Sequence, residues 1–238
     1  MTAHTKKTKR FTLDPDLRVV LPDGSERSLM TFLLPSALLM LGALLLMVST
    51  LLPYWSLKLL APQYPQGLKV SVYVNHLDGD VREVDSLNHY LGMPPLDEGG
   101  QLERSISVAA VVALGLLLTA GVFVHNRWAA LLALPALAFP LVFVADLWLI
   151  LYQYGHSIDP QSALGGAIEP FTPPILGRGD IGQFGSFARF EIGFYLAVAA
   201  AAVILAGLWF HRRAYKPVAD ARKRARAAAQ QTAQQAAA

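Results

Sequence analysis

Four long apolar runs constrain this chain more than any other feature of its sequence. They cover residues 31–53, 106–125, 128–152 and 191–211. A helix needs about 20 mainly apolar residues to cross the roughly 30 Å hydrocarbon core of a bilayer, so each run is long enough to span a membrane once. The chain is 54% hydrophobic and only 16% charged, which is more apolar than an average soluble domain. We therefore predict a mainly α protein, a polytopic four-helix transmembrane bundle.

The basic residues predict how this bundle is oriented. Most of the 20 Lys and Arg residues lie in the tail 1–30, in the turn after the second run, and in the basic tail 212–238. Short cytoplasmic segments of membrane proteins carry such an excess of positive charge. We expect a multi-pass protein of the bacterial inner (cytoplasmic) membrane with both termini cytoplasmic. The segments 54–105 and 153–190 then face outward, and the first run is an uncleaved signal anchor because no Ala-x-Ala site follows it.

The composition also excludes several functions. The chain has no cysteine, which excludes disulfides, thiolate metal sites, covalent c-type haem and a cysteine nucleophile. Its basic tails are explained by topology and by anionic lipid, so nucleic acid is not an expected partner. No nucleophile–base pair or phosphate-binding loop is visible, and we do not expect an enzyme.

The first outward segment has the pattern of a small folded domain. Apolar and polar residues alternate over residues 69–75, which predicts a half-buried strand. Residues 81–84 are expected to return as a second strand, and a short helix over 87–91 is expected to end at Gly92. We predict a small α+β extracytoplasmic domain inserted between helices 1 and 2. The Pro- and Gly-rich segment 153–190 lacks strand or helix periodicity and is expected to be a shaped loop packed on that domain.

Within this domain, Leu87–Met93 places an imidazole and a thioether four residues apart. A helix would bring His89 and Met93 to one face, with the carboxamide of Asn88 beside them. Thioether and imidazole together suit copper, especially Cu(I). Ordinary packing is the alternative explanation of the same spacing.

The end of the third run holds further candidates. Asp146 lies inside the apolar run, where an ionisable group is costly and should face the bundle or a polar partner. His156 follows the predicted helix end, and Asp159 begins a turn. An ion pair of Asp146 with Arg178 or Arg189, or a cap on a loop amide, is an equally good structural explanation. For His156 the alternative is a hydrogen bond at the interface.

Four short motifs lie in order along residues 54–177: APQYPxGL at 61–68, LNHYLGM at 87–93, YxYGHxxDP at 152–160 and PPILG at 173–177. Together they resemble a bacterial four-span membrane protein family encoded near nitrous oxide reductase and copper-accessory genes. The resemblance implies a role with copper and points to six residues, Asn88, His89, Met93, Asp146, His156 and Asp159. Residues 178–183 and the basic tail 212–238 depart from the family pattern.

These observations lead to one hypothesis and one alternative. The hypothesis is an integral membrane accessory protein that binds or hands over copper on the outer face during assembly of a copper-dependent respiratory enzyme such as nitrous oxide reductase. His89, Met93 and His156 would be ligands, oriented by Asp146 or Asp159. Expected partners are the lipid bilayer and a periplasmic copper-binding protein or copper enzyme, and a homo-oligomer could complete the site. The alternative is a structural or assembly subunit of a membrane complex that binds no metal.

Overall fold

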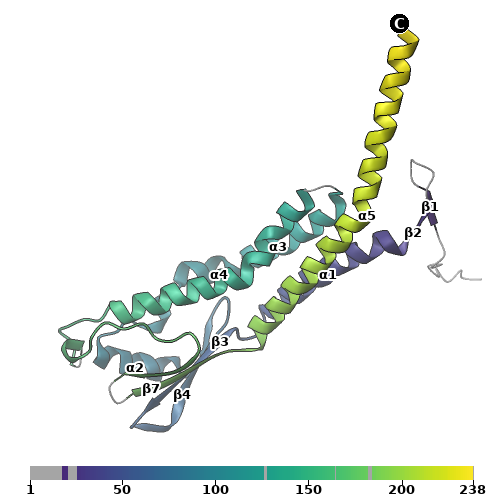
Figure 1. Cartoon of the computed structure of the whole chain (residues 1–238). Helices are drawn as coiled ribbons and strands as arrows, with labels where there is room; N and C mark the ends of the chain where they lie inside the picture. The colour runs from purple at the N-terminus through teal and green to yellow at the C-terminus, as the bar shows by residue number, and fades with distance from the viewer. Residues whose placement is uncertain (1–17, 21–25, 126–127, 164, 182–183, 238) are drawn as a thin grey trace, which may run out of the picture.

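The computed structural model describes residues 18–20, 26–125, 128–163, 165–181 and 184–237. Its frame is four long apolar helices, α1 (Met30–Ser49), α3 (Gln101–Phe123), α4 (Trp128–His156) and α5 (Ile192–Ala237). All four are long and apolar enough to cross a membrane, which confirms the predicted polytopic bundle. The start of α1 and the free end of α5 lie at one end of the bundle, which we call the tail end (Figure 1). A β-sheet lies at the opposite end, the domain end.

The helix boundaries differ from the predicted ones mainly outside the apolar runs. Helix α3 begins at Gln101 rather than at 106, and α4 continues to His156 rather than ending at 152. Helix α5 does not stop near 211 but runs on through the basic tail to Ala237 (Figure 1). Hydropathy marks the part of a helix that suits lipid, whereas the helix itself continues wherever its backbone bonds can form.

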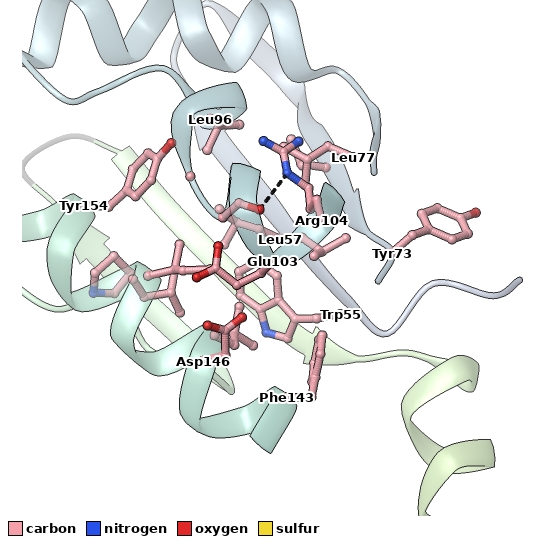
Figure 2. A pocket seen from close by; sticks show the side chains of 18 of the residues that line it. Trp55, Leu57, Tyr73, Leu77, Leu96, Glu103, Arg104, Phe143, Asp146 and Tyr154 are labelled. Carbon is pink, nitrogen blue, oxygen red and sulfur yellow. Dashed lines mark hydrogen bonds between the residues drawn. The ribbon is translucent and has the colours of Figure 1, made fainter. Parts of the chain in front are cut away.

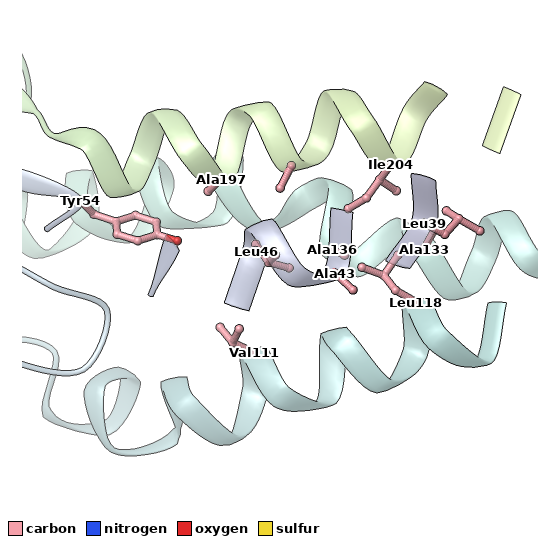
Figure 3. Close-up of a cluster of buried hydrophobic side chains, with 11 residues drawn as sticks. Leu39, Ala43, Leu46, Tyr54, Val111, Leu118, Ala133, Ala136, Ala197 and Ile204 are labelled. Atoms are coloured by element: carbon pink, nitrogen blue, oxygen red, sulfur yellow. The ribbon is translucent and has the colours of Figure 1, made fainter. Parts of the chain in front are cut away.

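Small side chains allow the helices to pack closely at the centre of the bundle. Ala133 and Ala136 of α4 and Ala197 and Ala200 of α5 are fully buried there. They surround larger aliphatic residues of the other helices, such as Leu46 (Figure 3). In lipid there is no hydrophobic effect to bring helices together, so close backbone approach and van der Waals packing stabilise their association.

Both outward segments build the sheet at the domain end. Its order is β5 (Leu77–Gly79), β4 (Tyr64–Val72), β3 (Trp55–Ala61), β7 (Phe184–Phe190) and β6 (Gly177–Ile181), all antiparallel. The central strand β3 therefore joins a strand that precedes α3 to one that follows α4. The domain is not simply inserted between the first two long helices.

The expectation of a strandless loop over 153–190 is wrong for residues 177–181 and 184–190, which form β6 and β7. In β7, Phe184, Ser186 and Ala188 are buried, whereas Phe187 and Arg189 are exposed. This is the alternation of a half-buried strand. The sequence does not reveal this alternation, because a polar residue, Ser186, lies on the buried face and an apolar residue, Phe187, lies on the exposed face.

The strand predicted over 81–84 is also wrong, because these residues begin helix α2 (Val81–Leu91). Val84, Leu87 and Leu91 lie on one helical face and pack against the sheet, a spacing of three and four residues that belongs to a helix. The short β5 pairs with β4 instead. Gly92 ends α2 with φ +75°, as predicted, in the left-handed conformation that glycine adopts readily.

The alternation over 69–75 is confirmed as far as Val72, where β4 ends. A small hairpin of β1 (Arg18–Val20) and β2 (Glu26–Ser28) precedes α1. The basic residues of the first 17 positions and part of the turn after the second apolar run, at 126–127, lie outside the described residues.

Tyr54 fastens the domain to the bundle. Its side chain is fully buried, and its hydroxyl lies 2.5 Å from Ser49 Oγ at the end of α1. Its backbone N–H donates to Val72 O at 2.8 Å, and its carbonyl accepts from Glu191 N at 2.9 Å. Burial raises the pKa of Tyr54 to about 12, although the hydrogen bond with Ser49 acts in the opposite direction. The phenol is therefore neutral across the physiological range.

Glu191 ties the start of α5 to the outer face of the sheet. Its carboxylate accepts hydrogen bonds from Ser56 Oγ at 2.8 Å and Arg189 Nε at 2.9 Å, with Lys69 Nζ at 3.8 Å. Burial by itself would raise the pKa of Glu191, but these hydrogen bonds and the two positive charges outweigh it and lower the pKa. Glu191 is therefore ionised, and it links the start of α5 to the sheet.

Candidate functional site: an apolar cavity at the domain end

A cavity of about 350 Å³ lies where the sheet meets the ends of α3 and α4. Its walls are the inner face of β3 and β4, one side of α2, the first turns of α3 and the last half of α4 (Figure 2). Most of the lining is aliphatic or aromatic, with Trp55, Leu57 and Phe143 among the central side chains. A mainly apolar cavity of this size with a few polar groups is the usual form of a small-molecule site.

Arg104, Ser107 and Ser186 also line the cavity and bind partners of their own, and three acidic or amide side chains interrupt the apolar lining beside them. Glu103 of α3 and Asp146 of α4 point into the same space beside Trp55 (Figure 2). The carboxamide of Asn88 on α2 belongs to the same wall, although Asn88 is only 5% exposed. Within the described part of the chain, none of the three side chains has an ion pair or a hydrogen bond to another residue. The two carboxylates and the amide oxygen of Asn88 are therefore acceptors with no donor among the described residues.

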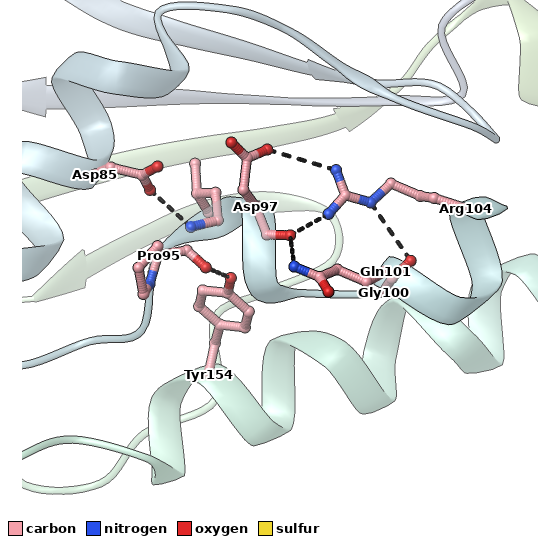
Figure 4. Close-up of polar contacts among 8 residues, drawn as sticks. Asp85, Pro95, Asp97, Gly100, Gln101, Arg104 and Tyr154 are labelled. Atoms are coloured by element: carbon pink, nitrogen blue, oxygen red, sulfur yellow. Dashed lines mark hydrogen bonds and ion pairs between the residues drawn. The ribbon is translucent and has the colours of Figure 1, made fainter.

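A second set of polar contacts holds the wall between α2 and α3 in place. Arg104 pairs with the Asp97 carboxylate at 3.6 Å and also donates to the Asp97 carbonyl. Asp85 accepts a hydrogen bond from Leu96 N at 2.7 Å, and the Tyr154 hydroxyl donates to the Pro95 carbonyl (Figure 4). Because Arg104 is occupied by Asp97, it is not available to neutralise Glu103.

The six residues predicted as a copper site fall into two groups. Asn88, Met93 and Asp146 all line the cavity. Of these, Met93 also packs against the core between α2 and the sheet. The proposed ion pairs of Asp146 are not formed, because Arg178 pairs with Asp180 and Arg189 pairs with Glu191. Asp146 instead faces the cavity.

His89, His156 and Asp159 lie outside the cavity wall, and all three are exposed. The His156 ring stacks on Tyr152 with centroids 4.0 Å apart, and its Nδ1 lies 2.8 Å from the Tyr152 carbonyl, a contact within α4. Asp159 uses its carboxylate to accept from Gln161 N at 2.9 Å. In the residues that the structure describes, no group of three or more His, Asp or Glu side chains is placed to hold a metal ion.

The two motif segments are nevertheless neighbours. Asp159 N donates to Gly92 O at 2.8 Å, so the end of α2 and the turn after α4 are joined by a backbone bond. The hypothesis that His89, Met93 and His156 share one site requires the segment 87–93 to lie beside the end of α4, and this contact agrees with that placement. The histidine side chains of the two segments are exposed at this junction.

Glu103 and the apolar residues of β3 were missed as site residues. Nothing near Glu103 in the sequence links it to Asp146, because the two lie on different helices and meet only through the packing of α3 on α4. A partial signal was the position of Glu103 just before an apolar run, where a carboxylate favours a helix start. Because its position at a helix start already explains the carboxylate of Glu103, the sequence gives no reason to expect that Glu103 also lines a cavity.

The four apolar helices and the sheet domain define a multi-pass helical membrane protein with a ligand-sized cavity at one end. Comparison of the chain with protein-family models, with curated proteins and with solved structures finds no match. The geometry of the cavity is therefore the main basis for a functional proposal.

Proposed function

We propose that this protein binds an amphiphilic, lipid-derived molecule in the cavity at the domain end. The observation that carries the proposal is the cavity itself, about 350 Å³ of mainly apolar space at the end of the membrane-spanning helices. Apolar space of this kind holds water poorly, because water needs several polar partners, and it readily accepts hydrocarbon. The proposal places the domain on the outer face of the bacterial inner membrane.

Access to the cavity supports a ligand that arrives from the bilayer. Ile106 of α3 and Val142 of α4 line the cavity and are 53% and 60% exposed on the bundle surface. Both residues belong to the apolar spans. A hydrocarbon chain in the adjoining leaflet can therefore enter between α3 and α4 without crossing a polar layer, while its head group stays near the sheet domain.

An Ala110→Phe variant is expected to weaken binding by about tenfold or more, because a phenyl group in the cavity displaces the ligand's hydrocarbon. Both Ala109 and Ala110 of α3 are exposed, but only Ala110 lines the cavity. Binding of a neutral brominated monoacylglycerol would be measured by quenching of tryptophan fluorescence in a non-ionic detergent. The matched Ala109→Phe variant should bind like the wild type. Equal binding by both variants would contradict the proposal.

A copper role is the second candidate, and the resemblance to a family encoded near copper-accessory genes motivates it. One observation favours it: the backbone bond between Asp159 and Gly92 joins the two motif segments, and their histidines are exposed. Here the protein would bind or hand over copper during assembly of a copper-dependent respiratory enzyme. His89, Met93 and His156 would be the ligands, and the partner would be a periplasmic copper protein.

The copper proposal predicts one Cu(I) per chain that resists a competing chelator, and loss of that ion in the double variant His89→Ala with His156→Ala. Imidazole and thioether ligands suit Cu(I). The control is His76→Ala, since His76 is exposed on the same domain but stacks on Tyr73 and is not a proposed ligand. If the wild type takes up no Cu(I), the non-metal assembly subunit becomes the better alternative. If the double variant keeps the ion, His89 and His156 are not its ligands.

A further inference from the structure

We infer that the ligand of the cavity carries a primary ammonium group, held by Glu103, Asp146 and Asn88. This inference rests on the proposed function, because it names the head group of the amphiphile that the cavity takes. It gives a role to these three polar side chains, which a purely apolar ligand would leave without a binding partner.

The first step is the unbalanced charge of the cavity. Glu103 and Asp146 line the same apolar space and interact electrostatically with each other. None of the salt bridges among the described residues involves either carboxylate. Glu103 is exposed at the edge of the cavity and Asp146 is half-buried, and the repulsion between two carboxylates so placed is relieved when a cation lies between them. A cationic ligand group supplies that charge.

The second step is Asn88, which points to a ligand independently of the carboxylates. Its side chain is buried by α2 and the sheet, yet it lines the cavity without a hydrogen-bond partner among the described residues. Buried amides nearly always have a partner, so a buried amide that faces an open cavity is an available binding group. Its oxygen accepts a hydrogen bond and complements the two carboxylates.

The third step is the match between these acceptors and one cation type. A primary ammonium has three N–H donors and no acceptor. Two carboxylates and one amide oxygen provide three acceptors in the same cavity. A quaternary ammonium has no N–H to donate, and a metal ion would leave the apolar lining unused. The combination of an apolar cavity and these acceptors is that of an alkylamine or an aminolipid such as an ethanolamine lipid.

The test compares head groups on one chain length in the wild-type protein. Dodecylamine, dodecyltrimethylammonium, dodecanoate and monolauroylglycerol would displace the brominated monoacylglycerol in non-ionic detergent at pH 7. We expect dodecylamine to bind about tenfold or more tightly than the neutral monolauroylglycerol, because charge-assisted hydrogen bonds form only with the ammonium. The quaternary amine should lie between them, and dodecanoate should bind most weakly. This comparison needs no variant and so does not depend on folding of a mutant.

Variants then assign the preference to residues. In Glu103→Gln with Asp146→Asn, dodecylamine should lose its advantage while monolauroylglycerol still binds. Asn88→Leu should reduce the difference between the primary and the quaternary amine. If all head groups bind the wild type equally, the ammonium inference is overturned and the amphiphile proposal stands. If no dodecyl compound binds, the amphiphile proposal itself fails. An ethanolamine phospholipid in place of dodecylamine distinguishes a membrane lipid from a free amine as the source of the group.

Discussion

A Gly155→Ala variant is expected to lower the thermal unfolding midpoint by roughly 6–12 °C, corresponding to about 3 kcal/mol. Gly155 lies in the last turn of α4, where its carbonyl accepts a hydrogen bond from Phe171 N at 3.1 Å. A Cβ atom at Gly155 would lie 1.8 Å from the Phe171 carbonyl oxygen and 3.3 Å from Pro173. Backbone cannot yield as a side chain can, so the loop that leads to β6 must move away from α4.

The control for this prediction is Gly166→Ala. A Cβ atom there would meet only the Pro160 carbonyl oxygen, at 3.3 Å, so this variant should unfold within about 2 °C of the wild type. Phe171 and Pro173 line the cavity, and for this reason Gly155→Ala should also weaken binding of the brominated monoacylglycerol. An unchanged midpoint in Gly155→Ala would show that α4 and the Phe171 segment are not packed as described.

A Tyr54→Ala variant is expected to cost about 3–5 kcal/mol of stability, which is the usual range for removing a large aromatic residue from a core. Tyr54 packs against Phe143 at 4.9 Å and Phe139 at 6.1 Å between ring centroids, where α1, α4 and the sheet meet. Its removal leaves a cavity at that junction and loosens the domain from the bundle. The measurement is thermal unfolding in detergent, followed by tryptophan fluorescence.

Tyr54→Phe separates the ring from the hydroxyl. This variant keeps the packing and loses only the contact with Ser49, so we expect a cost of about 1 kcal/mol. The loss is small because Ser49 Oγ also donates to the Leu46 carbonyl at 2.6 Å and keeps that partner. Equal effects of Ala and Phe at this position would show that the hydroxyl, and not the ring, holds the domain in place.

Part of the candidate site could be predicted from the sequence. Asp146 attracted attention because a carboxylate inside an apolar run needs a reason, and Asn88 and Met93 belonged to a compact motif. All three line the cavity. The role of the motif changed, because its histidine points to the exposed surface while its asparagine faces inward. Neighbouring positions on a helix differ by about 100°, so membership of a motif does not decide which side chain reaches a site.

The sheet illustrates the limit of reading local patterns. Strand β7 contains Gly, Ser and Arg between its aromatic residues, and its pairing with β3 joins residues more than 120 positions apart, such as Trp55 and Phe190. Strand pairing depends on the partner strand and on the face that it covers, and β-propensity is correspondingly dependent on context. The first part of the helix at 81–91 was missed for the opposite reason: Val81 to Val84 also suit a strand over so short a span.

By itself, the sequence determined the four apolar helices, the approximate limits of their apolar parts and the ending of α2 at Gly92, because these depend on composition and on local backbone preferences. Only the tertiary structure decided that two separate outward segments form one sheet, and that Glu103, Asp146 and Asn88 face one apolar cavity. Hydrophobic length is a property of consecutive residues and can be read along the chain. A cavity is the space left between elements that are distant in sequence, and its lining is settled only when those elements pack.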